Sequence, residues 1–158
     1  MQATPSTIEL HDQPGHAIRR LHQIAVGIFL QETAELGLTP VQYAALQSVH
    51  NEPGIDQRTL ASRIAQDTST TAGVVERLQG RGWLQRAPDP ADRRVRRLHL
   101  TDAGRAVLAA AQPAMQRAQV RILQPLTDAE RAHFMALLQR VVQHNNVHSR
   151  APAAPAGV

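Results

Sequence analysis

The fold is decided by residues 67–104, which read DTSTTAGVVERLQGRGWLQRAPDPADRRVRRLHLTDAG. The pattern predicts a helix that opens with Ser and Thr, a glycine turn, a strand, a loop of Pro, Asp and Arg, a second strand and the start of another helix. Much of the chain's positive charge falls in this stretch, on Arg77, Arg81, Arg86, Arg93, Arg94, Arg96 and Arg97. A helix followed by an arginine-tipped hairpin is suited to a DNA duplex, with the helix in the major groove and the hairpin on the backbone or in the minor groove.

Composition sets the class of protein around this stretch. The chain has 158 residues, enough for one domain with a core, and its 3% aromatic content favours an aliphatic, mainly helical core over a β-sandwich. The net charge is +4, and every Lys or Arg position is Arg. The absence of Cys excludes disulfides and thiol-based metal sites. The sequence has neither a signal-peptide pattern nor a long apolar run, so we expect a soluble cytoplasmic protein with no membrane partner.

Helix-start signals place several helices before the hairpin. An apolar period predicts a helix over residues 16–35, which Gly37 ends, and Thr39 opens the next helix with Pro40 behind it. Asp56 caps a short helix, and Asp67 or Thr68 caps the one after it. The helix capped by Asp56 and the helix after it form a predicted helix-turn-helix. The alternative is an ordinary helical hairpin with a solvated face. Beyond residue 100, Thr101 caps the next helix, and Thr127 with Glu130 forms a predicted capping box for the one after it.

The helical period divides the second helix of this pair into two sides. Its buried side carries Thr71, Val75 and Leu78. Its exposed side carries Ser69, Thr70, Gly73 and Arg77. The hairpin that follows favours the DNA-binding interpretation. Strand-like runs at residues 83–86 and 95–100 flank a loop that two prolines stiffen and two arginines tip. Such a loop suits a narrow minor groove, and Asp92 is expected to orient the Arg94 side chain there.

These residues resemble the MarR family of winged-helix transcription regulators. The resemblance is carried by Leu60-Ala61, by Asp67 with Ser69-Thr70, by residues 75–82 (VERLQGRG), by the D-x-R pattern at residues 92–94 and by the L-T-x-x-G pattern at residues 100–104. It covers residues 16–148. It implies major-groove or backbone contacts from the recognition helix, a minor-groove arginine at Arg94 and a buttressing Asp92. The candidate DNA-binding residues are Thr68, Ser69, Thr70, Gly73, Arg77, Asp92, Arg93 and Arg94.

The resemblance also implies a domain organisation and a homodimer. Residues 1–14 are predicted to be a flexible arm, residues 15–148 one unit, and residues 149–158 a disordered tail. Within the unit, residues 39–104 form the winged helix, and residues 15–36 and 105–148 form dimerisation helices. These outer helices are too apolar for an exposed surface, which favours a homodimer on other grounds. The expected partner is double-stranded DNA with two-fold half-sites.

A further implication of the resemblance is a small aromatic acid effector. The segments HAIRRLHQIAVGIF and LTPVQYAAL are similar to a MarR subgroup tied to the breakdown of aromatic or heteroaromatic acids, including nicotinate-type compounds. The candidate ligand-binding residues are His16, Arg20, Gln23 and Tyr43. An Arg with a His one helical turn away can hold a carboxylate. The alternative is that these residues form a solvated face of the first helix.

Three other classes of function remain to be weighed. A metal-responsive regulator would use His144 with His148, or the histidines between residues 11 and 22, but a matched carboxylate pattern is lacking. An enzyme is not expected, because no nucleophile–base set or phosphate loop is recognised, and no cofactor is expected. A non-specific architectural DNA-binding protein is the nearest rival to a specific repressor.

Overall fold

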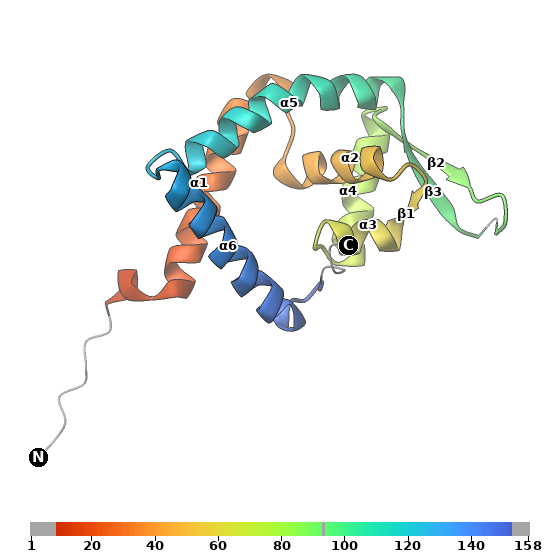
Figure 1. The fold of residues 1–158 in the computed structure, drawn as a ribbon. Coiled ribbons are helices and arrows are strands. Elements are labelled where there is room, and N and C mark those ends of the chain that lie inside the picture. Colours follow the sequence, from red (N-terminus) through yellow and green to blue (C-terminus); the bar gives the residue numbers. More distant parts are fainter. Residues whose placement is uncertain (1–8, 93, 153–158) are drawn as a thin grey trace, which may run out of the picture.

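The computed structural model describes residues 9–92 and 94–152 of the chain. Within them, six α-helices and a three-stranded antiparallel sheet are arranged as a winged helix-turn-helix with additional outer helices (Figure 1). This confirms the predicted fold class, mainly helical with a small β-wing.

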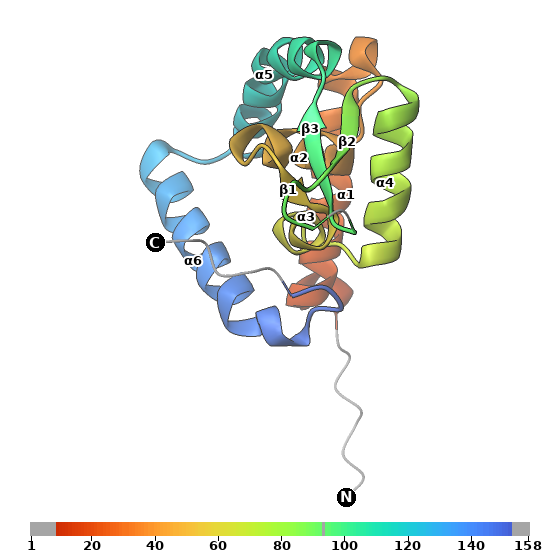
Figure 2. The ribbon, with the colours of Figure 1, turned by 90° about the vertical axis from the view of Figure 1, so that its right-hand side faces the viewer.

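Helices α1 (Pro14–Glu32) and α5 (Asp102–Ile122) lie side by side along one side of the molecule (Figures 1 and 2). Glu32 joins them, because its carboxylate accepts hydrogen bonds from Arg117 Nε at 2.8 Å and Arg121 Nη1 at 2.6 Å. The bonds from Arg117 and then Arg121 hold the pKa of the Glu32 carboxyl below its usual range. Helix α1 ends three residues before the predicted limit, since η2 (Ala34–Leu36) forms a 3-10 turn there.

The connection to α2 (Pro40–Asn51) follows the predicted start signal. Gly37 has φ 59°, a left-handed conformation that glycine adopts without strain. Thr39 and Gln42 then form a complete capping box, with Pro40 in the first turn. This region therefore folds as its local sequence predicts.

The helix-turn-helix pair consists of α3 (Gln57–Arg63) and α4 (Thr68–Gly80). Asp56 caps α3 by accepting a hydrogen bond from Thr59 N at 2.9 Å. Asp67, rather than Thr68, is the N-cap of α4. The predicted inner face of α4 is confirmed, because Thr71, Val75 and Leu78 are each fully buried.

The sheet has the strand order β1-β3-β2. Strands β2 (Leu84–Pro88) and β3 (Arg96–Leu100) form the predicted hairpin, in the register Leu84 opposite Leu100 and Arg86 opposite Leu98. Strand β1 (Ile55–Asp56) was not predicted, since two residues carry no strand period. The sheet, α1 to α4 and the first half of α5 enclose one core. It is formed by Phe29, Leu38, Ala45, Leu46, Val49, Ile55, Leu60, Val74, Val75, Leu78, Leu84, Leu98, Leu100, Leu108 and Ala111.

The join between β3 and α5 explains the L-T-x-x-G pattern. Thr101 caps α5 by accepting a hydrogen bond from Gly104 N at 3.0 Å, and its hydroxyl donates to the Gly82 carbonyl at 2.6 Å. A Cβ atom on Gly104 would lie only 1.9 Å from the carbonyl oxygen of Trp83. Only glycine lets α5 start this close to the strand.

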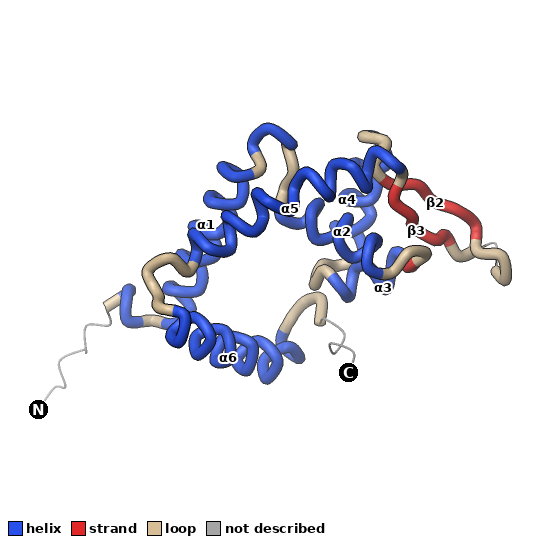
Figure 3. The backbone as a smooth tube through the Cα atoms, turned by 45° about the horizontal axis from the view of Figure 1, so that its top comes forward, coloured by secondary structure: helices blue, strands red, loops and turns tan. Residues whose placement is uncertain are grey.

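Helix α6 (Asp128–Asn145) stands apart from α2, α3 and α4 (Figures 1 and 3). The predicted capping box at Thr127 and Glu130 is present, yet none of the helix's residues is buried. The large exposed apolar side chains in the described part of the chain all lie outside residues 39–104: Leu10, Ile18, Ile24, Leu30, Val120, Met135, Leu137, Val141, Val142 and Val147.

The chain ends were predicted to be a flexible arm and a disordered tail. In the described parts of them, Leu10–Asp12 form a 3-10 turn (η1), and η3 (Asn146–His148) precedes residues 149–152. None of the described helices combines the length and apolar character needed to span a membrane.

Candidate nucleic-acid interface

The N-terminus of α4 is organised by the carboxylate of Asp67. This carboxylate accepts hydrogen bonds from Thr70 N, Ser69 Oγ and Thr70 Oγ1, each at 2.7 Å. The bond from Thr70 N and those from the two hydroxyl groups hold the pKa of the Asp67 carboxyl far below its usual range. A fixed negative charge therefore caps the helix and gathers two hydroxyl groups on its outer surface.

The outer face of α4 carries the predicted major-groove residues. Thr68, Ser69, Thr70 and Arg77 are exposed, and Gly73 is half-buried. Gly73 and Arg77 are one turn apart, and a Cβ atom on Gly73 would lie 3.5 Å from Arg77 Nη2. The guanidinium thus lies back along the helix over Gly73, so the face combines small residues with one long cationic side chain.

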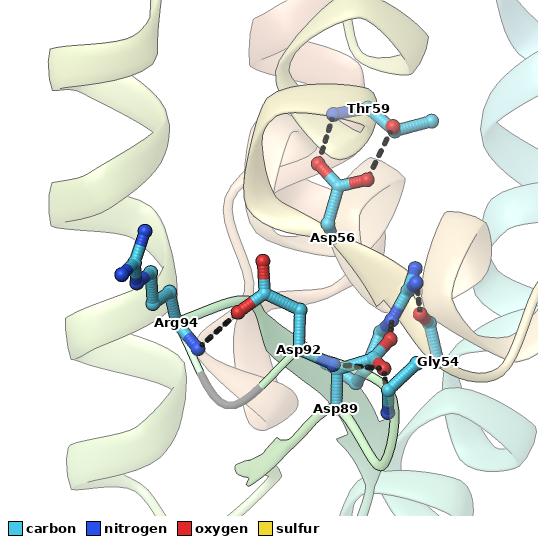
Figure 4. Close-up of polar contacts among 8 residues, drawn as sticks. Gly54, Asp56, Thr59, Asp89, Asp92 and Arg94 are labelled. Atoms are coloured by element: carbon cyan, nitrogen blue, oxygen red, sulfur yellow. Dashed lines mark hydrogen bonds and ion pairs between the residues drawn. The ribbon is translucent and has the colours of Figure 1, made fainter.

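The wing is held by Asp89, a residue that the sequence analysis did not single out. Asp89 is buried, and its Oδ1 accepts hydrogen bonds from Ala91 N at 2.6 Å and Asp92 N at 3.1 Å (Figure 4). Its Oδ2 forms an ion pair with Arg97 Nε, and Arg97 Nη1 donates to the Gly54 carbonyl at 3.2 Å. The hydrogen bond from Arg97, followed by those from the loop backbone, keeps the pKa of Asp89 below its usual range.

Asp92 acts on the loop backbone instead of the arginine side chain that it was predicted to orient. Its Oδ1 accepts a hydrogen bond from Arg94 N at 3.0 Å, and the Arg94 side chain points away from it (Figure 4). The prediction that Asp92 grips the guanidinium is therefore corrected, because the carboxylate is used to close the turn. Arg93 lies outside the described residues.

Two of the remaining arginines of the stretch, Arg81 and Arg97, hold the fold together. Arg81 donates to the carbonyls of Gly37 at 2.7 Å and Leu36 at 3.2 Å, and its guanidinium stacks on the Trp83 ring at 3.6 Å. It therefore ties the end of α4 to the α1–α2 connection. Arg97 is likewise structural, through Asp89.

An open groove of about 540 Å³ separates the wing from the start of α3. Arg86 Nη2 spans one side of it by donating to Gln57 Oε1 at 2.9 Å. The groove is lined by Asp56, Gln57, Arg86, Arg94, Val95, Arg96 and Arg97. Its cationic lining lies beside the wing and suits the phosphates of a nucleic-acid backbone.

The four candidate ligand residues do not form one pocket within a single chain. Tyr43 packs edge-on against Phe29, with ring centroids 6.1 Å apart, and burial raises its pKa. Phe29 lies 13 positions beyond His16, about 20 Å along the helix axis. Arg20 was predicted to lie beside His16 and Gln23, but Arg19 contacts both of these side chains, at 3.4 Å each.

His144, His148 and the histidines between residues 11 and 22 were considered as metal ligands. Within the described residues, no group of three or more His, Cys, Asp or Glu side chains is placed to hold a metal ion.

The sequence profile of the MarR family matches residues 38–95. The transcriptional repressor NicR of Pseudomonas putida is 31% identical over 148 residues, which cover 89% of this chain and 94% of NicR. The chain belongs to the MarR family. It is a winged-helix transcription regulator and not an enzyme.

Solved structures of other MarR proteins share the fold. PcaV from Streptomyces coelicolor, in complex with its natural ligand, superposes with a TM-score of 0.82 at 38% identity, over 87% of this chain and 97% of PcaV. Bordetella bronchiseptica BpsR, whose DNA binding is regulated by 6-hydroxynicotinic acid, gives 0.81 at 31% identity, over 86% and 97%. The repressor CouR bound to a 23-mer DNA duplex gives 0.81 at 29% identity, over 89% and 99%.

Proposed function

We propose that this MarR-family chain is a homodimeric repressor that binds a pseudo-palindromic operator and is released by a small aromatic or heteroaromatic carboxylate. The observation that carries the proposal is the pairing of an exposed Ser/Thr/Arg face on α4 with an ordered, arginine-bearing wing. In a family whose members include a repressor bound to duplex DNA, this pairing supports sequence-specific binding over non-specific packaging.

For the DNA contacts, we assign α4 to the major groove and the wing to the minor groove. Thr68, Ser69, Thr70, Gly73 and Arg77 would face the bases and the nearby backbone. Arg94, with Arg93 beside it, would enter the minor groove, and Asp92 would shape the loop that carries them. A narrow minor groove attracts Arg because its negative potential is concentrated there.

The homodimer is supported by where the apolar surface lies. Val141 and Val142 of α6 are 50% and 59% exposed, and Ile18 of α1 is 55% exposed. A groove of about 310 Å³ between α1, α5 and α6 is lined mainly by apolar side chains such as Ile18, Leu21 and Phe134. We assign residues 15–36 and 105–148 to dimerisation and residues 39–104 to DNA binding. A dimer would place its two α4 helices about one turn of the DNA helix apart.

For the effector, we retain His16, Arg20, Gln23 and Tyr43 as candidates, and a second copy of the chain would have to complete the site. The regulation of BpsR by 6-hydroxynicotinic acid supports a carboxylate on a heteroaromatic ring. Arg and His side chains, which α1 carries, can hold a carboxylate by charge-assisted hydrogen bonds.

The experiment is a footprint of the purified protein on DNA flanking its own gene, repeated with hydroxylated benzoates and nicotinates. We expect two protected half-sites with two-fold symmetry, and loss of protection with at least one acid. Uniform coverage without preferred sites would contradict specific repression. Protection that no acid relieves, or a full response in Arg20→Ala, would contradict the effector assignment alone.

A further inference from the structure

We propose that Asp67 fixes the hydroxyl groups of Ser69 and Thr70 as hydrogen-bond acceptors, so that this end of α4 selects the bases that present an amino group in the major groove, adenine or cytosine. The inference rests on the proposed DNA-binding function and deepens it, because it names the chemical class of base that is read. Asp67 is a positioning residue here, and Ser69 and Thr70 are the specificity-determining groups.

The hydroxyl hydrogens of Ser69 and Thr70 are both used in hydrogen bonds to Asp67. A hydroxyl group has one hydrogen to donate and two lone pairs to accept with. The Asp67 carboxylate lies 2.7 Å from both Ser69 Oγ and Thr70 Oγ1. An ionised carboxylate can only accept, so both hydroxyl hydrogens must point at Asp67. The strongly lowered pKa of Asp67 agrees with this ionised state.

With its hydrogen bonded to Asp67, each hydroxyl group can still accept a hydrogen bond from a ligand. Ser69 and Thr70 are exposed, and each hydroxyl oxygen keeps two lone pairs with which it can accept hydrogen bonds. To donate to a ligand, either group would first have to break a charge-assisted hydrogen bond to Asp67, which is stronger than a neutral one. Both groups therefore meet DNA as acceptors.

Only some groups of DNA can donate a hydrogen bond to the Ser69 and Thr70 hydroxyl groups. In the major groove the adenine N6 and cytosine N4 amino groups are donors, whereas guanine N7 and O6, adenine N7 and thymine O4 are acceptors. Phosphate oxygens are also acceptors. An acceptor-only pair of hydroxyls thus discriminates against guanine, thymine and the backbone. Arg77, further along the same face, has only donors and complements this by favouring guanine or phosphate.

The test uses synthetic half-sites derived from the footprinted operator. Each adenine is replaced in turn by purine, which lacks the 6-amino group, and each cytosine by 2-pyrimidinone, which lacks the 4-amino group. In parallel, each guanine is replaced by 7-deazaguanine, which lacks the N7 acceptor. Binding of the wild type, Ser69→Ala and Thr70→Val to each duplex completes a set of double-mutant cycles, which cancels the effect of the analogue on the duplex itself.

We expect loss of one amino group to weaken wild-type binding about tenfold, with little further loss in the variant that lacks the partnering hydroxyl. Coupling of either hydroxyl to guanine N7 instead would overturn the inference while leaving specific DNA binding intact. The absence of any preferred duplex would overturn the proposed function, and the inference with it.

Asp67→Asn supplies the matched positioning variant. Asn is as good an N-cap as Asp, so the thermal midpoint should stay close to that of the wild type. The amide can also donate, which frees the hydroxyl groups to turn outward. We expect the base preference at the coupled positions to relax, whatever the removal of a negative charge does to overall affinity. An unchanged base preference in Asp67→Asn would refute the role assigned to Asp67.

Discussion

The winged-helix part and helix α6 obey the same local rules but differ in what they bury. Residues 39–104 build an aliphatic core that α1 and the first half of α5 close, and Leu46, Leu60 and Leu98 in it are fully buried. Helix α6 has an equally well-formed capping box at Thr127, but none of its residues is buried. Local sequence therefore decides that a helix forms in both regions, whereas only the first region contains the surface that it packs against.

This difference separates two sources of stability. The winged helix should owe its stability to contacts within one chain, because its apolar side chains already face one another. Helix α6 should owe its position to a second copy of the chain, since short helices are only marginally stable without packing. Substitutions that affect one source of stability and not the other test this difference.

The largest effect is expected for Gly104→Ala, at the tightest contact within the winged-helix part. The new methyl group would overlap the Trp83 carbonyl oxygen, which is backbone and cannot rotate away. We expect a loss of about 3 kcal/mol or more in the free energy of unfolding, measured by urea titration. Gly80→Ala is the control, because nothing lies within 4 Å of the added atom there. A Gly104→Ala protein as stable as this control would contradict the close approach.

The next effect should fall on assembly while sparing the fold. Val141→Lys places a charge on the apolar face of α6, where the Val141 side chain is 50% exposed. We expect sedimentation to show monomers at micromolar concentration and operator binding to fall at least tenfold, with an unchanged circular dichroism spectrum. Gln143→Lys, on the opposite side of the helix, should remain dimeric. Dimers in both variants would place the interface elsewhere.

The contrast also explains how much could be predicted from the sequence. A capped helix start depends on residues three positions apart, so the sequence predicted these starts correctly, with the choice between Asp67 and Thr68 left open. Helix α1 has no side-chain cap and begins at Pro14, two residues before its predicted start. The buried face of α4 and the hairpin also followed from periodicity. The caps predicted in this way are Thr39, Asp56, Thr101 and Thr127.

Contacts that depend on register or on distant segments could not be predicted. Asp89 meets Arg97 only because β2 and β3 pair in one register, and sequence reasoning chose Asp92, which is nearer the tip of the loop. Arg81 reaches the carbonyl of Gly37, which lies 44 positions earlier in the chain. The signal that could have pointed to Asp89 was its place between two prolines, where an Asp side chain caps a turn.

A smaller effect is expected at the tip of the wing, which contributes neither to the winged-helix core nor to the proposed contact of α6 with a second copy. Arg94→Ala should lower operator affinity about tenfold, because it removes the proposed minor-groove contact, and should leave the dimer and the unfolding midpoint unchanged. Fluorescence anisotropy at several salt concentrations measures this effect. Arg140→Ala on α6 removes an equal charge far from the wing and should bind as the wild type does. Equal affinities for the two variants would remove Arg94 from the interface.

The smallest effect should come from Asp89→Asn, which loosens the wing from its sheet without unfolding either region. The folded-state pKa of Asp89 lies below its ordinary value of about 3.9, so its carboxylate stabilises the folded protein above that pH. This contribution is lost as the pH falls through the lowered folded-state pKa. We therefore expect the difference in unfolding free energy between the wild type and Asp89→Asn to be constant from pH 7 to pH 5 and to shrink below pH 4. Taking the difference cancels the other carboxylates with lowered pKa, such as Asp67 and Glu130. A gap that stays constant down to pH 2 would mean that Asp89 holds the wing by its shape and not by its charge.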